Sequence, residues 1–97
     1  MDMETLLRKI KAELPLLRER FGLKRLAVFG SVARGTASSE SDVDILVDFD
    51  EPCGFDAFMD LKFHLEDLLG KRVDLVTSKA LKSSMKSEIE REAINVA

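Results

Sequence analysis

The residues best suited to chemistry lie in one short stretch, where a glycine–serine pair precedes two closely spaced aspartates. Gly30-Ser31 is followed by ten residues and then by Asp42-Val43-Asp44, and an apolar, strand-like run adjoins each end of this stretch. A glycine lets the backbone approach a ligand closely, and amides exposed at the start of a short helix favour phosphate oxygens. The pattern predicts that Gly30 and Ser31 hold the phosphates of a nucleotide.

The two aspartates can share one side of a strand. In a strand over 43–49, alternation puts Asp42 and Asp44 on the same face, with backbones roughly 7 Å apart. Carboxylates this close repel each other unless a cation lies between them, and Mg²⁺ prefers oxygen ligands combined with substrate phosphates. Asp74, in a third expected strand, can join them if the two strands are neighbours. Three carboxylates would then hold two Mg²⁺ ions, and Asp74 could also orient or deprotonate an attacking hydroxyl.

Each of these features also has a purely structural explanation. An aspartate before a strand is often part of a turn, a strand aspartate such as Asp74 can simply face solvent, and Gly-Ser can be a plain strand-to-helix turn. Arg34 could make a bidentate contact with a phosphate or a carboxylate, or form an ordinary surface salt bridge. The order and spacing of the whole set favour function over these alternatives.

The remaining candidates are weaker. Lys79, Lys82 and Lys86 recur at helical spacing and could touch a triphosphate or an anionic partner, but a solvated helix face explains them as well. His64 fits a surface or half-buried helix position better than a ligand. Cys53 has no base nearby in sequence, which argues against a catalytic thiol.

Length and composition limit the class of protein. With 97 residues the chain suits one domain, 1–97, and its net charge of −3 argues against strong stand-alone binding to nucleic acid. Cys53 is the only cysteine, which rules out an internal disulfide and fits a reducing, cytoplasmic setting. No apolar run approaches the ~20 residues needed to span a bilayer, so no membrane association is expected.

The apolar periodicity predicts helices alternating with short strands. Within the first helix, Pro15 is expected either to start a second helix or to kink a continuous one. The helix over 55–69 is expected to bury Phe55, Phe58, Met59, Leu61, Leu65, Leu68 and Leu69, and the last helix to carry a stripe of Leu81, Met85, Ile89 and Ala93. The expected elements are helices at 4–21, 30–35, 55–69 and 79–93 and strands at 25–29, 43–49 and 72–77. This order predicts an α/β (α+β) fold in which a small mixed three-stranded sheet is flanked by helices.

At these residues the chain resembles the minimal nucleotidyltransferase (MNT) family of the DNA polymerase β-like superfamily. The family signature is Gly-Ser, a ten-residue gap, Asp-x-Asp and a third aspartate on a later strand, matched here by 30–35, 41–44 and 73–76. The resemblance extends from about Leu23 to Val96. Departures are confined to the tail, where the family often has a proline near Leu81 and an aromatic residue near the C-terminus.

The resemblance implies a polymerase β-type palm in which Asp42 and Asp44 hold two Mg²⁺ ions and Asp74 completes the site. Gly30 and Ser31 would hold the nucleoside triphosphate, and Arg34 would assist at its phosphates. It further implies the antitoxin half of a HEPN–MNT pair, which transfers AMP from ATP to a tyrosine of its HEPN toxin.

Two other functions remain open from the sequence. The chain could neutralise a toxin by contact alone, as a non-catalytic nucleotide-binding module. It could also be the catalytic subunit of an enzyme that adds nucleotides to a nucleic-acid end. So small a domain leaves little chain for an acceptor-binding region, so the acceptor is expected to dock from another molecule, in a homo- or hetero-oligomer.

Overall fold

A computed structural model describes residues 2–30, 33, 35, 42–51 and 54–96. The predicted short helix over 30–35 and the loop after it therefore lie largely outside the described residues. The described elements are, in chain order, α1 (Met3–Phe21), β1 (Leu23–Phe29), β2 (Val43–Phe49), α3 (Phe55–Leu69), β3 (Val73–Thr77), the 3-10 helix η1 (Ser78–Ala80), α4 (Ser83–Glu92) and β4 (Ile94–Asn95).

The first helix begins and ends at residues that suit those positions. The Asp2 carboxylate accepts a hydrogen bond of 2.8 Å from the Thr5 amide, and this backbone contact lowers the pKa of Asp2. Gly22, with φ of 67°, ends the helix in the left-handed conformation. Between them α1 is one helix that includes Pro15, so the alternative of a second helix was wrong. Pro15 lies on the exposed side, and Leu14 and Leu17 are buried on either side of it.

Within the described residues the sheet has four strands in the order β3-β2-β1-β4, one more than predicted. β1 pairs with β2 in antiparallel fashion, and β2 pairs with β3 in parallel fashion. The additional strand, β4, pairs with β1 through only two register partners, and the amide of Val96 then bonds to the Leu26 carbonyl at 2.8 Å. A two-residue strand is too short to leave a periodic signal, which is why the sequence did not reveal it.

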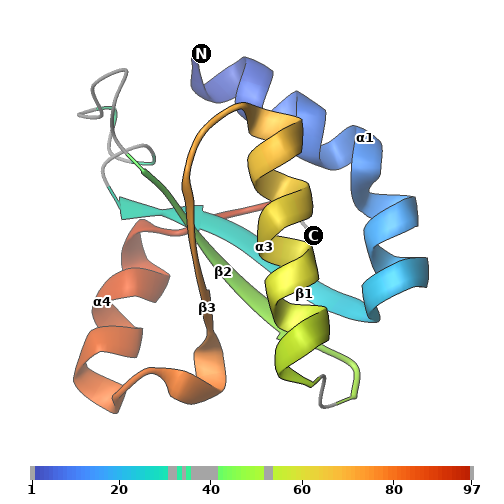
Figure 1. Cartoon of the computed structure of the whole chain (residues 1–97). Coiled ribbons are helices and arrows are strands. Elements are labelled where there is room, and N and C mark those ends of the chain that lie inside the picture. Colours follow the sequence, from blue (N-terminus) through green and yellow to red (C-terminus); the bar gives the residue numbers. More distant parts are fainter. Residues whose placement is uncertain (1, 31–32, 34, 36–41, 52–53, 97) are drawn as a thin grey trace.

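Helices lie on both sides of this sheet (Figure 1). The side chains facing α1 and α3 form the main core, which includes Leu26, Val28, Val43, Ile45, Val47, Val73 and Leu75 from the strands and Leu6, Ile10, Leu14, Leu17, Leu61, Leu65 and Leu69 from the helices. α4 lies on the other side, where Arg25 of β1 contacts Glu90 of α4. On this second face Ala27 and Leu46 are register partners and fully buried.

The predicted helical burial was right in the middle of α3 and wrong at its start. Leu61, Leu65 and Leu69 are buried, whereas Phe55 is 76% exposed. Phe55 is the first residue of the helix, so it has no preceding turn to pack on. The last predicted helix is divided into η1 and α4, and α4 buries no residue, with Met85 50% exposed. None of the helices that the structure describes is long and apolar enough to cross a bilayer.

Candidate active site

Asp44 lies at the centre of the predicted site because of the sheet register. Its antiparallel partner on β1 is Phe29, next to Gly30, and its parallel partner on β3 is Asp74. Register partners on neighbouring strands carry their side chains on the same face of the sheet, with strands about 4.8 Å apart. Asp44 and Asp74 therefore share the second face, opposite the main core. The condition that β2 and β3 are neighbours is confirmed.

Gly30 comes into close contact with Asp44. Gly30 is buried and has φ of 76°, a conformation that residues with a Cβ rarely adopt. A Cβ built on Gly30 would lie 2.9 Å from Cγ of Asp44 and still nearer to its Oδ2, so no side chain fits there. The absence of a side chain at position 30 thus allows the Asp44 carboxylate to lie against the backbone directly after β1.

Asp42 and Asp74 are the more accessible carboxylates. Asp42 directly precedes β2 and is exposed, Asp74 is exposed on β3, and Asp44 is half-buried between β1 and β3. Among the residues that the structure describes, no three acidic, histidine or cysteine side chains are grouped closely enough to hold a metal ion. The shared face of Asp44 and Asp74 is thus a finding, and the Mg²⁺ site stays a prediction. Ser31 and Arg34, predicted to contact phosphate, lie outside the described residues.

Sequence reasoning missed a polar network on the same face. Arg25 donates to Oδ1 of Asn95 from Nε at 3.1 Å and from Nη2 at 3.0 Å, and its Nη1 lies 2.7 Å from Oε1 of Glu90. Asp48, the register partner of Arg25, accepts a hydrogen bond from the Ser78 hydroxyl. The only sequence signal was the alternation that puts Asp48 on the face of Asp44. The network connects β1 with α4 and β4, and β2 with η1.

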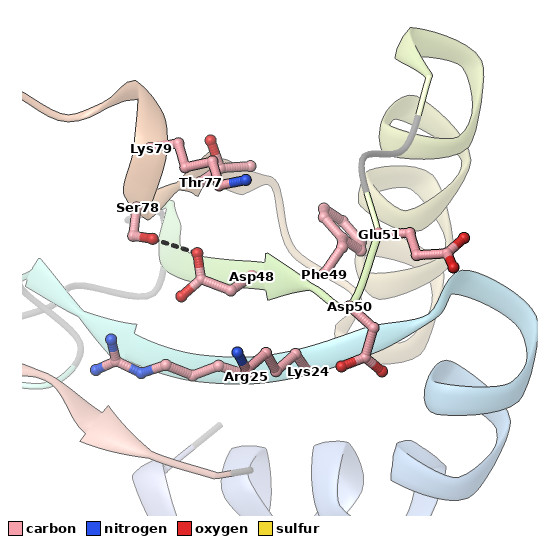
Figure 2. A pocket seen from close by; sticks show the side chains of 9 residues that line it. All are labelled: Lys24, Arg25, Asp48, Phe49, Asp50, Glu51, Thr77, Ser78 and Lys79. Carbon is pink, nitrogen blue, oxygen red and sulfur yellow. Dashed lines mark hydrogen bonds between the residues drawn. The ribbon is translucent and has the colours of Figure 1, made fainter.

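A cavity of about 570 Å³ lies near this network (Figure 2). It is at the end of β2 farthest from Asp42, and none of the predicted site aspartates lines it. Its lining carries charges of both signs and consists of Lys24, Arg25, Asp48, Phe49, Asp50, Glu51, Thr77, Ser78 and Lys79. Of the three lysines singled out in the sequence, Lys79 is the one that reaches it.

Comparison with known proteins identifies the family of the whole chain. A family model described as "Nucleotidyltransferase domain" matches residues 7–96. The protein adenylyltransferase MntA of Thermococcus cleftensis is 47% identical, over 98% of this chain and 93% of that protein. A solved structure of a minimal nucleotidyltransferase is 45% identical, with a TM-score of 0.82 over 97% of this chain and 95% of that one.

More distant solved structures are complexes. A toxin–antitoxin structure with AMP-PNP is 26% identical, with a TM-score of 0.77 over 94% of this chain and 72% of that one. A tri-AMPylated HEPN toxin from Shewanella oneidensis in complex with its MNT antitoxin gives a TM-score of 0.70 at 22% identity, over 97% of this chain and 71% of that one. At 22% identity, the likeness to the Shewanella oneidensis complex concerns the fold alone.

The fold and the family match thus define the class of enzyme, the nucleotidyltransferases. The chain belongs to the nucleotidyltransferase domain family, and within it to the minimal nucleotidyltransferases related to MntA. The family resemblance seen in the sequence is confirmed, and so is the predicted enzyme class.

Proposed function

We propose that this chain is a Mg²⁺-dependent protein adenylyltransferase, which transfers AMP from ATP to a tyrosine hydroxyl of a HEPN-type toxin and thereby acts as its antitoxin. The reaction would take place in the cytoplasm, where ATP is available and the single Cys53 stays reduced. The observation that carries the proposal is the position of Asp44, which lies against Gly30 on one side and is in register with Asp74 on the other.

The known relatives support the finer parts of this proposal. The relative at 47% identity is named for protein adenylylation. The neighbour at 26% identity is a toxin–antitoxin structure with an ATP analogue, and a more distant one pairs an AMPylated HEPN toxin with an MNT antitoxin. A protein acceptor also suits a chain with a net charge of −3 better than a long nucleic acid does.

The residues of the site have distinct tasks in such a reaction. The turn at Gly30 and Ser31 would bind the triphosphate through backbone amides and the serine hydroxyl. The acceptor hydroxyl would attack the α-phosphorus in line, forming a new O–P bond as the bond to the bridging oxygen breaks and pyrophosphate leaves. Asp74, which is exposed and therefore reachable, would orient this hydroxyl and accept its proton.

The ligand type of the three aspartates is the one that Mg²⁺ prefers, since Asp42, Asp44 and Asp74 supply only carboxylate oxygens. Because the described residues include no group of three acidic side chains close enough to hold an ion by themselves, the aspartates would hold it together with the phosphates of ATP. When bound, Mg²⁺ neutralises charge that develops on the phosphate oxygens. Without it, the carboxylates would repel an incoming triphosphate.

The direct test is the mass of the acceptor. The chain is incubated with ATP, Mg²⁺ and a HEPN-type toxin, and the intact mass of the HEPN protein is measured. We expect an increase by one or more AMP groups, mapped by fragmentation to tyrosine. The double variant Asp42→Asn with Asp44→Asn should abolish the increase and leave the unfolding transition in place, since neither side chain belongs to the main core.

A matched control uses a carboxylate of α3. Asp67 is exposed on this helix, so Asp67→Asn removes a negative charge without touching the site and should transfer AMP at the wild-type rate. Neutralisation of the toxin without any increase in mass would favour the non-catalytic binding module. Addition of nucleotides to an RNA end, with the HEPN protein unmodified, would favour the nucleic-acid enzyme.

A further inference from the structure

One edge of the sheet is open next to the proposed site. β3 has β2 on one side and, among the described residues, no strand on the other. In parallel pairing, alternate residues bond to the neighbouring strand, and the amide of Val43 bonds to the carbonyl of Arg72 at 2.9 Å. The backbone of Val73, Leu75 and Thr77 therefore points away from β2, towards the open edge.

The side of α3 that faces this edge is identified by a hydrogen bond. The Val73 amide donates to Oε2 of Glu66 at 2.9 Å, so this outward amide is satisfied by a side chain rather than by a strand. Residues 55, 59, 62 and 66 follow one side of the helix at spacings of four, three and four. Phe55 and Met59 thus lie on the same side of α3 as Glu66.

The direction of the two elements brings Phe55 near the end of β3. α3 and β3 are packed together and run in opposite directions, so the start of the helix lies beside the last residues of the strand (Figure 1). Phe55 is 76% exposed there, and Met59 is half-buried. An exposed aromatic side chain thus stands at the end of α3 that lies beside the last residues of β3.

The geometry points to β3 as the docking edge for an extended, tyrosine-bearing segment of the acceptor protein; this inference rests on the proposed function. Such a segment would add a strand to the sheet through the backbone of Leu75 and Thr77. Alternate side chains of the segment would pack on Phe55 and Met59. The others would lie on the face of Asp74, about 4.8 Å away across the strands, which is where the acceptor hydroxyl must be.

The occupant follows from this two-sided arrangement. A segment that pairs with β3 has one set of side chains on the apolar side of α3 and the other on the carboxylate face, as an acceptor requires. The segment would also pass the rim of the cavity at Thr77 and Lys79, where charged side chains of both signs could meet its flanking residues (Figure 2). A second copy of this chain would gain the backbone pairing without delivering a tyrosine hydroxyl, because the chain contains no tyrosine.

Amide hydrogen exchange tests the docking directly. The wild-type chain is mixed with a HEPN-type toxin, without ATP, so that binding is measured apart from chemistry. We expect exchange at the amides of Leu75 and Thr77 to slow by at least about tenfold in the complex, because these outward groups become hydrogen-bonded. Unchanged exchange at both amides in a formed complex would overturn the inference.

A pair of phenylalanine variants tests the apolar contact. Phe55→Ser should raise the Kd for the HEPN protein by roughly tenfold or more, because a side chain buried on binding is lost. Phe63→Ser is the control, since Phe63 is also exposed, at 51%, but lies about 80° further round the same helix. Equal losses for the two variants, or none for Phe55→Ser, would contradict the proposed edge.

Two outcomes separate this inference from the proposed function. AMP transfer with no protection at Leu75 and Thr77 would reject the docking edge and leave the reaction intact. Protection without any AMP transfer would keep the docking edge and reject the reaction. The amides of Leu75 and Thr77 could instead be protected without the HEPN protein, to a degree that increases with the concentration of this chain. That result would mean that β3 pairs with a second copy, and it would also overturn the inference.

Discussion

The carboxylate of Asp44 lies against the α-carbon of Gly30, at a distance that leaves no room for a Cβ. The contact joins the end of β1, at Phe29, to the start of β2, at Val43. Thirteen residues, 30–42, lie between these two strand ends. The contact explains why the family signature combines a glycine with the second aspartate of Asp-x-Asp. Gly30 leaves room for the carboxylate because it has no side chain, and Asp44 provides the negative charge.

Gly30→Ala should therefore impair both stability and transfer. A residue with a Cβ at positive φ costs about 1–2 kcal/mol, and the overlap with Asp44 adds to this cost. Gly22→Ala is the matched control, because Gly22 has a similar φ of 67° and nothing within 4 Å of its Cβ position. We expect Gly22→Ala to cost only the backbone strain and to retain AMP transfer. Urea unfolding and the transfer rate measure the two effects, and equal behaviour of both variants would contradict this reasoning.

Asp74→Asn should slow transfer without loosening the fold. Removing a general base typically costs about 10²–10⁴-fold in rate, and the Asp74 side chain is exposed, so little packing is lost. Titration calorimetry with ATP and Mg²⁺ would separate nucleotide binding from the chemical step. A variant that transfers AMP at the wild-type rate would remove Asp74 from the reaction.

Arg25→Lys should loosen the C-terminal part of the chain. Lysine keeps the charge but cannot reproduce the forked contacts of Arg25 with Asn95 and Glu90. These side chains are partly exposed, so we expect a loss of about 1 kcal/mol or less. Faster hydrogen exchange of the Val96 amide, which bonds to Leu26, would reveal the effect. Unchanged exchange there would show that β4 stays paired without this network.

Acid should fray the start of α1. The hydrogen bond from the Thr5 amide lowers the pKa of Asp2 below its unfolded value, so the cap stabilises the helix at pH values above the unfolded pKa. This stabilisation is lost as the pH falls through the folded pKa. Asp2→Asn keeps a comparable cap that does not titrate. In this variant, exchange of the Thr5 amide should show no loss of protection as the pH falls through the folded pKa of Asp2. An identical pH profile in both proteins would argue against the cap as the cause.

Local patterns predicted the elements that are long and periodic. Alternation gave β2 as Val43–Phe49, and helical spacing ending at Gly70 gave α3 as Phe55–Leu69, both as the structure has them. The same spacing wrongly buried Phe55, since periodicity does not reveal that the first residue of a helix has no preceding turn to pack on. The parallel register of Asp44 with Asp74 depends on which strands are neighbours, and the sequence could state this only as a condition.

The two borders of the sheet differ in a way that bears on self-association. β4 covers the outer side of β1 with only Ile94 and Asn95, so this cover is thin. If β4 detached from β1, each molecule would have unpaired backbone groups at both edges of the sheet. Copies of the chain could then associate edge to edge. The pairing of Ile94 and Asn95 with β1 therefore occupies part of the edge that such association would need.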